Sequence, residues 1–266
     1  MFPNDKPKKQ KIKLPNIGKI LVIASGKGGV GKSTFASNLA IALVEAGNKV
    51  GLLDADVYGP SMPRIFNIKE KGEVKNNLLI PFCKYGVKIM SMGFLVPEES
   101  ALVWRGPMLT KAIHQLFKMT LWATQEEPLD YLIIDTPPGT GDIHLSIAEN
   151  YEIDGAIIIT TPQTLAVVDA LKAIDMFKKL QINVLGIIEN MSFFINSTTG
   201  HKEYIFGKSG LTDYCKNNKI QYIGDVPIDK NLADKTLINL IDDNAIKSLF
   251  RSIINNLKLS SCASKN

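Results

Sequence analysis

Short apolar segments recur along the chain, separated by longer segments in which apolar and polar positions are mixed. The short segments carry Ile, Val and Leu on successive positions, a pattern typical of strands buried on both faces of a parallel sheet. Strands are predicted at residues 19–24, 50–53, 131–134, 156–160, 184–188 and 221–224. Helices are predicted at residues 32–46, 108–119, 143–150, 165–180, 209–217 and 245–257. Two further apolar runs, 78–81 and 87–91, predict a small extra hairpin.

The alternation of strands and helices predicts the fold class α/β, a doubly wound domain with a mostly parallel sheet and ligands outside the carboxyl ends of its strands. We expect this domain to cover residues 18–258, between a basic flexible tail (1–17) and a C-terminal tail (259–266). Five lysines and one aspartate in residues 1–15 carry +4 of the net charge of +5, so the domain itself is nearly neutral. A neutral body disfavours a face that binds nucleic acid.

The hydropathy of the chain and its cysteines indicate where the protein is located and which kinds of site are disfavoured. The longest apolar runs, 20–24 and 156–159, are far shorter than the roughly 18 residues of a membrane span. The first residues also lack the apolar core of a signal peptide, so we expect a cytoplasmic protein. Cys83, Cys215 and Cys262 are odd in number and widely spaced, which argues against a disulfide framework and a single-chain zinc site.

Residues 26–33 read Gly-Lys-Gly-Gly-Val-Gly-Lys-Ser between the first predicted strand and the first predicted helix, and match the phosphate-loop pattern G-x-x-x-x-G-K-[ST]. Such a loop turns backbone N–H groups inward, and the helix N-terminus adds partial positive charge, so that a polyphosphate such as that of ATP can be held. Lys32 is expected to reach the β- and γ-phosphates and Ser33 to ligate Mg²⁺. The residues predicted to contact the nucleotide here are Gly26, Lys27, Gly28, Gly29, Val30, Gly31, Lys32, Ser33 and Thr34.

Three aspartates follow predicted strands and are candidates for the chemistry at the γ-phosphate. Asp56 is predicted to orient or deprotonate the attacking water, and Asp54 to support Mg²⁺ or its waters. For both, capping of the following turn is the alternative. Asp135 ends an apolar strand, the Walker B arrangement, and is predicted to hold a water of the Mg²⁺ shell. The Pro- and Gly-rich residues 136–142 that follow predict a switch loop that senses the γ-phosphate.

The extra lysine at position 27 gives the pattern K-G-G-x-G-K-[ST], which resembles the deviant Walker A group of P-loop proteins, the MinD/ParA/Mrp branch. Further motifs make the chain similar to the Mrp/ApbC family over essentially residues 18–258. They are Asp-Ala-Asp-Val-Tyr-Gly-Pro-Ser at 54–61, Trp-Arg-Gly-Pro-Met at 104–108, Asp-Thr-Pro-Pro-Gly-Thr-Gly-Asp at 135–142, Glu-Asn-Met-Ser at 189–192 and Ile-Phe-Gly at 205–207.

The resemblance implies a homodimeric, Mg²⁺- and ATP-dependent ATPase that acts in iron–sulfur cluster assembly or transfer to apoproteins. It implies that Lys27 reaches across the dimer to the nucleotide of the partner, so that Lys27, Lys32 and Asp56 form the catalytic set. It also implies that Asn190 contacts adenine and that Pro227 packs near the same ring. An asparagine that only closes a turn is the alternative for Asn190. The implied partners are iron–sulfur assembly proteins and apoprotein recipients.

The sequence departs from the family at the cluster ligands. Family members carry a Cys-x-x-Cys pair shortly after the Asn-Met-Ser segment, and those positions fall on Asn196 and Thr199 here. Amide and hydroxyl groups are poor ligands for iron–sulfur centres. The resemblance therefore supports an ATPase role more strongly than cluster binding at these two positions. His144 and His201 lack further ligands at metal spacing, which favours surface or hydrogen-bonded histidines.

Two other functions are weighed against this interpretation. The last predicted helix has one apolar stripe, which fits either a helix packed on its own core, the favoured prediction, or a MinD-like switch that binds membrane in its ATP form. The stripe consists of Ile246, Leu249, Phe250, Ile253, Ile254 and Leu257. A ParA-like DNA-binding ATPase is disfavoured by the nearly neutral body.

Overall fold

The computed structural model describes residues 10–57, 59–95, 106–229, 232 and 243–259. Several predictions concern residues outside these ranges: the first part of the basic tail, Tyr58, the Trp104-Arg105 pair and Cys262.

The core of the described structure is one eight-stranded sheet in the order β12-β9-β8-β1-β7-β2-β6-β5. Every pairing in it is parallel except that of the edge strand β5 with β6. Its strands are β1 (Ile17–Ala24), β2 (Val50–Asp54), β5 (Phe82–Lys84), β6 (Val87–Ser91), β7 (Leu129–Asp135), β8 (Gly155–Thr160), β9 (Val184–Glu189) and β12 (Tyr222–Asp225). The predicted α/β class and mostly parallel sheet are confirmed.

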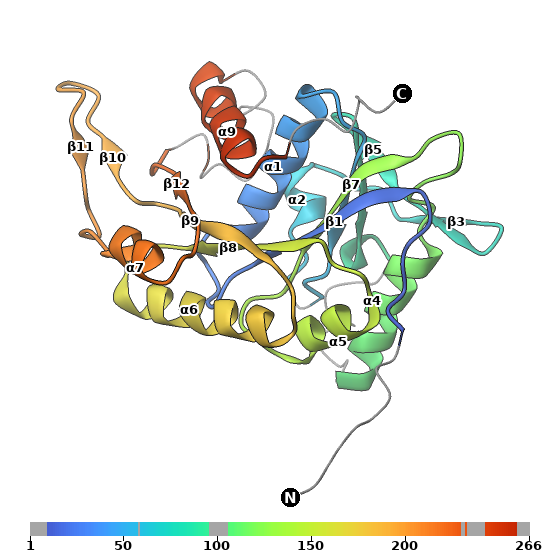
Figure 1. Ribbon diagram of the computed structural model, residues 1–266. Coiled ribbons are helices and arrows are strands. Elements are labelled where there is room, and N and C mark those ends of the chain that lie inside the picture. The colour runs from blue at the N-terminus through green and yellow to red at the C-terminus, as the bar shows by residue number, and fades with distance from the viewer. Residues whose placement is uncertain (1–9, 58, 96–105, 230–231, 233–242, 260–266) are drawn as a thin grey trace, which may run out of the picture.

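Helices cover both faces of this sheet, and Figure 1 shows α4, α5 and α6 along one face with α1 and α9 on the other. The helices are α1 (Lys32–Glu45), α2 (Met62–Ile65), α4 (Gly106–Met119), α5 (Asp142–Asn150), α6 (Thr164–Lys179), α7 (Leu211–Asn217) and α9 (Asn244–Asn256), with a short 3-10 turn at Met92–Phe94. Because both faces are covered, the central strands need apolar residues at successive positions. All six residues of β8 are buried accordingly.

The region of residues 73–91 differs from the prediction. Residues 78–81 and 87–91 do not pair with each other: β4 (Leu78–Ile80) pairs with β3 (Glu73–Lys75) in a separate two-stranded sheet, and β6 joins the main sheet beside β2. The predicted hairpin is therefore wrong. A short apolar run indicates a strand but not its partner: β6 pairs in parallel with β2 and, in a local antiparallel hairpin, with β5 instead of β4.

Some residues within the two predicted tails pack on the domain. Within the range assigned to the flexible N-terminal tail, Ile12 forms a parallel bridge to Tyr151, and Leu14 is buried. At the other end, the N–H of Leu259 donates to the carbonyl of Ile254, and the Leu259 side chain is buried. These apolar side chains extend the core at its margins, which a charge count over the tails does not detect.

Helix α9 packs on the domain, as predicted. Its apolar stripe faces α1, where the rings of Phe35 and Phe250 lie with centroids 5.4 Å apart, and Ile246, Ile253 and Ile254 are buried. None of the helices in the described ranges combines the length and apolar character that a membrane span needs.

A short two-stranded arm projects from the domain next to β9. It consists of β10 (Phe194–Ile195) and β11 (Lys202–Glu203), and Figure 1 shows it extending away from the sheet. This arm could not be predicted from the sequence, because strands of two residues are too short to show an alternation of apolar and polar positions.

Candidate functional site

The loop between β1 and α1 has the backbone geometry that its glycines predict. Gly29 and Gly31 have φ of 79° and 82°, in the left-handed region that favours glycine, and Gly31 is the N-cap of α1. A Cβ at Gly31 would also lie 2.3 Å from Nδ2 of Asn190, and one at Gly26 would lie 2.1 Å from the backbone of Asp169 in α6. The loop is thus fitted tightly between β9 and α6, with its N–H groups at the N-terminus of α1.

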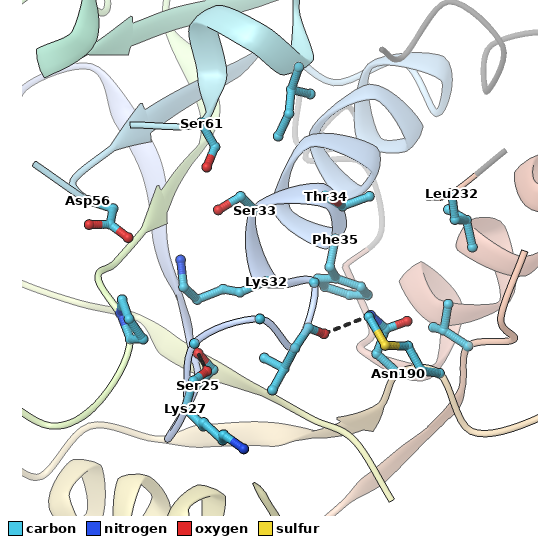
Figure 2. A pocket seen from close by; sticks show the side chains of 18 of the residues that line it. Ser25, Lys27, Lys32, Ser33, Thr34, Phe35, Asp56, Ser61, Asn190 and Leu232 are labelled. Carbon is cyan, nitrogen blue, oxygen red and sulfur yellow. Dashed lines mark hydrogen bonds between the residues drawn. The ribbon is translucent and has the colours of Figure 1, made fainter. Parts of the chain in front are cut away.

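A cavity of about 690 Å³ opens above this loop. Figure 2 shows the loop at its floor and side chains from several elements around it. The structure brings these predicted site residues to its wall: Lys27, Gly28, Gly29, Val30, Gly31, Lys32, Ser33, Thr34, Asp56, Asn190 and Pro227. Gly26, Asp54 and Asp135 do not line the cavity. Gly26 lies under the loop against α6, and the two aspartates lie at the ends of β2 and β7.

Lys32 and Asp135 form a buried ion pair between the phosphate loop and the end of β7. The distance from Nζ of Lys32 to Oδ1 of Asp135 is 2.5 Å, and the two side chains are 7% and 0% exposed. The other carboxylate oxygen of Asp135, Oδ2, is buried without a hydrogen-bond partner among the described residues. A buried carboxylate oxygen with no donor is suited to a cation or to one of its waters.

Asp54 lies beside this pair and is fully buried. Its Oδ2 accepts hydrogen bonds from the N–H groups of Ser61 and Met62, at 2.9 and 3.1 Å, and from the hydroxyl of Ser91 at 3.0 Å. Burial and, after it, the charge of Asp135 raise the pKa of Asp54 to about 7. The geometry matches the turn-capping alternative, because these bonds hold the chain that leads into α2.

Asp56 and Lys27 approach the cavity from opposite sides. Figure 2 shows the Asp56 carboxylate facing the space above Lys32 and Ser33. The N–H of Gly59 donates to Oδ1 of Asp56 at 3.3 Å, which orients that carboxylate. Lys27 is exposed, and its side chain extends away from Lys32 (Figure 2). A lysine in this position can reach a second molecule placed over the cavity.

Figure 2 shows Asn190 across the cavity from Asp56, and Pro227 also lines the cavity. Nδ2 of Asn190 donates to the carbonyl oxygen of Val30 at 2.8 Å, so the amide ties the loop after β9 to the phosphate loop. Leu232, on the same side as Asn190 in Figure 2, and Phe250 add apolar side chains to the wall. The sequence pattern predicts a core position for Phe250 but not its place at the cavity. That place depends on the packing of α9 on α1, which a local pattern does not reveal.

The loop of residues 136–141 separates this cavity from a second one of about 530 Å³. Pro138 and Asp56 line both cavities, whereas Pro137 and His144 line only the second of these two. The loop is therefore placed where the predicted switch would have to be. His144 is buried and hydrogen-bonded, in agreement with the prediction of a hydrogen-bonded histidine.

The positions that carry cysteines in the family lie at the tip of the β10–β11 arm. Oδ1 of Asn196 accepts hydrogen bonds from the N–H groups of Thr198 and Thr199, and its Nδ2 donates to Glu203 at 2.7 Å. These groups close the hairpin; Thr198 and Thr199 are exposed and Asn196 is half-buried. Cys215 is buried, burial raises its pKa to about 11, and Cys83 is exposed on the edge strand. The described part of the chain contains no group of three or more His, Cys, Asp or Glu side chains arranged to hold a metal ion.

Known proteins resemble this chain over most of its length. The family model described as ParA, NUBPL iron-transfer P-loop NTPase, matches residues 16–258. The iron-sulfur cluster carrier protein of Aquifex aeolicus is 46% identical over 227 residues, which are 84% of this chain and 61% of that protein. The iron-sulfur cluster transfer protein NUBPL of Mus musculus is 45% identical over 236 residues, 88% of this chain and 71% of that protein. The chain spans about three fifths of the length of the cluster carrier proteins of Aquifex aeolicus, Rickettsia conorii and Escherichia coli.

Solved structures agree with the fold. A nucleotide-binding protein from Archaeoglobus fulgidus in complex with ADP has a TM-score of 0.71 and 35% sequence identity, with 90% of this chain and 88% of that chain covered. The cell division ATPase MinD of Pyrococcus furiosus has a TM-score of 0.67 at 20% identity, with 91% and 99% covered, and shows the shared fold alone.

Proposed function

Because the chain belongs to the NUBPL iron-transfer P-loop NTPase family, we propose that it binds and hydrolyses Mg-ATP as a homodimer and acts in iron–sulfur cluster assembly or transfer to apoproteins. The observation that carries the proposal is the buried Lys32–Asp135 pair beneath a phosphate loop whose glycine geometry suits a polyphosphate. The named relatives are cluster carrier and transfer proteins, which supports the cellular role.

Nucleotide binding in this proposal uses both ends of the cavity. The backbone N–H groups of residues 26–31, with Ser33 and Thr34, hold the phosphates at the positive end of α1, and Lys32 neutralises the β- and γ-phosphates. The adenine lies at the apolar end, against Pro227, with the Asn190 amide within reach of its edge. The link from Asn190 to Val30 joins base recognition to the conformation of the phosphate loop.

The residues at the end of β7 and the start of α1 fit a magnesium ion. The unpartnered Oδ2 of Asp135 and the hydroxyl of Ser33 are hard oxygen ligands of the kind that Mg²⁺ accepts, directly or through its waters. When bound, the ion would offset the charge on the β- and γ-phosphate oxygens. We assign Asp54 a supporting role, because its carboxylate is saturated by the turn that follows β2.

Hydrolysis then needs a positioned water and positive charge at the transition state. Asp56 orients the water from the cavity wall, a role that depends on geometry and requires no shift of its pKa. Lys32 stabilises the developing charge in one subunit. Lys27, which points away from Lys32, supplies the second cation to the nucleotide of the partner subunit. Hydrolysis is thereby tied to formation of the dimer.

The cluster, as cargo, cannot be held by the usual pair in this chain. The amide of Asn196 donates to Glu203 and the hydroxyl of Thr199 accepts from the N–H of His201, so both groups are engaged in closing the arm. The thiolates therefore come from a partner protein or from a different cysteine of this chain, while the ATPase remains in place. Anaerobic reconstitution tests this, with iron and sulfide counted per dimer. Loss of a stoichiometric cluster on replacement of one among Cys83, Cys215 and Cys262 would identify a relocated ligand.

Steady-state phosphate release with Mg-ATP tests the ATPase. Lys32→Ala should abolish nucleotide binding or turnover, whereas Lys27→Ala should keep most of the ADP affinity and lose turnover. Lys172→Ala is a matched control, because Lys172 is a well-exposed lysine on α6 whose ion pair within the described ranges is with neighbouring Asp169. Undiminished hydrolysis in Lys27→Ala would overturn the role across the dimer. Absence of hydrolysis by the unaltered dimer, with normal ADP binding, would overturn the ATPase itself.

A further inference from the structure

His144 is a buried polar side chain that the proposed hydrolysis has not used. It is the third residue of α5, directly after the loop of residues 136–141, and only 2% of it is exposed. One edge of its ring packs against the ring of Phe177, with centroids 6.3 Å apart and planes at 75°. The polar edge of the ring faces the loop.

The hydrogen bonds around Thr136 fix which ring nitrogen of His144 carries the proton. The hydroxyl of Thr136 donates its single hydrogen to the carbonyl oxygen of Ile23, at 2.9 Å. Nε2 of His144 lies 3.0 Å from the same hydroxyl oxygen, which can then only accept. Nε2 is therefore the N–H donor, an assignment made from the network. The chain of bonds runs from α5 through the loop to β1.

The ring acts as a neutral donor. Burial and, after it, the positive charge of Lys32 lower the pKa of His144 to about 4. A protonated ring would place a second buried cation near the lysine of the phosphate loop. The ring contacts Thr136 through Nε2, and the backbone of Gly141 and of Pro137 partly offsets the lowering of its pKa.

The same loop has two backbone bonds to β1 and to the residue that follows it, just before the phosphate loop. The N–H of Thr136 donates to the carbonyl oxygen of Ile23 at 3.2 Å, and the N–H of Gly139 donates to that of Ser25 at 2.8 Å. Between these points the loop presents Pro138 to the nucleotide cavity. The position of Pro138 relative to the γ-phosphate thus depends on how firmly the base of the loop is held.

We propose that His144 is a positioning residue for hydrolysis: its Nε2–H fixes Thr136 and so holds residues 136–141 at the distance from the phosphate loop that the reaction needs. The inference rests on the proposed ATPase and adds a residue to it. His144 touches neither nucleotide nor water in this scheme. It acts through the loop, so its loss should lower kcat and leave nucleotide affinity nearly unchanged.

Two substitutions at this position separate positioning from core filling. His144→Leu fills the space without a donor. His144→Gln restores an N–H at about the place of Nε2. We expect His144→Leu to lower kcat for Mg-ATP roughly tenfold or more, with KM and ADP affinity within about twofold of the unaltered chain. His144→Gln should recover kcat to within about threefold. Equal losses in both variants, or a normal kcat in His144→Leu, would overturn the proposal.

Thr136→Val tests the same bond from its other end. It removes the hydroxyl with little change of volume, and should reproduce the loss of kcat. Thr136→Val also removes the bond from its hydroxyl to Ile23, so combination with His144→Leu should lower kcat no further than Thr136→Val alone. Additive losses would mean that the two side chains act separately, and would overturn the proposal.

Amide hydrogen exchange of the loop gives a readout that needs no hydrolysis. In His144→Leu the amides of Thr136 and Gly139 should exchange faster by about tenfold or more, and in His144→Gln they should not. Tyr151→Phe is the control, since it removes another buried hydroxyl contact, with His114, at the far end of α5. If the unaltered dimer fails to hydrolyse ATP, the proposed function fails, but amide exchange still tests whether His144 holds the loop. Unchanged exchange in His144→Leu would overturn the proposed role of His144.

Discussion

The neutral, buried state of His144 predicts a specific dependence of stability on pH. An imidazole with an ordinary pKa of 6.5 in the unfolded chain and about 4 in the folded protein binds its proton first in the unfolded state. Stability contributed by His144 is therefore complete above pH 6.5 and is lost as the pH falls toward 4. At about 1.4 kcal/mol per pH unit, the loss amounts to about 2 kcal/mol at pH 5 and about 3 kcal/mol at pH 4.

His144→Gln isolates this contribution, because glutamine keeps an N–H donor but cannot take up a proton. The variant should start somewhat less stable than the unaltered chain at pH 7.5, and should gain about 2 kcal/mol relative to it by pH 5. Only the change with pH matters, so any constant cost of repacking cancels. Free energies of unfolding from urea titrations at constant ionic strength, without Mg²⁺ or nucleotide, measure the difference at each pH.

Thr136→Val serves as the control for this measurement. It removes the hydrogen-bond partner but leaves the imidazole buried and able to titrate, so its stability should follow that of the unaltered chain from pH 7.5 to pH 5 with a constant offset. If the difference between His144→Gln and the unaltered chain were the same at both pH values, within about 0.5 kcal/mol, the reasoning from burial would be refuted. If Thr136→Val showed the same change of stability with pH as His144→Gln, the lost hydrogen bond between the two side chains would be the cause instead of burial.

Three further predictions concern packing around the site. Gly31→Ala should weaken ADP binding at least tenfold by calorimetry, because its left-handed backbone and the nearby Asn190 amide leave no room for a Cβ. Phe250→Ala should lower the free energy of unfolding by about 3–5 kcal/mol, since it removes a buried ring between α9 and α1. Tyr222→Phe should lower the free energy of unfolding by about 1–3 kcal/mol near neutral pH, because the Tyr222 hydroxyl donates to the Asp225 carboxylate. Urea titration measures both losses of stability.

The main sheet could be predicted from sequence because its central strands are apolar on successive positions, which only a doubly covered sheet requires. The phosphate loop could be predicted for a related reason: glycines at 29 and 31 are needed for their φ angles as well as for the ligand. Both signals are local. The chemistry of a few neighbouring residues determines them, whatever the rest of the chain does.

The parts that could not be predicted depend on which distant residues meet. The pattern of residues 87–91 predicts a strand, but its pairing with β2 depends on where the rest of the fold places β2. Asp54 reads as a metal ligand from its spacing to Asp56, yet three donors of the following turn and of Ser91 surround its carboxylate. His144 gave no signal for its loop contact, because a single histidine in a helical pattern says nothing about the hydroxyl it faces.

The central place of β1 has a consequence for the synthesis of the chain. β1 leaves the ribosome before both of its partners, β7 and β8, which begin more than a hundred residues later, at Leu129 and Gly155. At roughly 5–20 residues per second, about 5–20 s pass before the first partner appears. During that interval a strongly apolar strand is exposed with no edge to join. Translational pauses before residue 135, and chaperones that shield β1, should therefore govern how much of this protein reaches its native state.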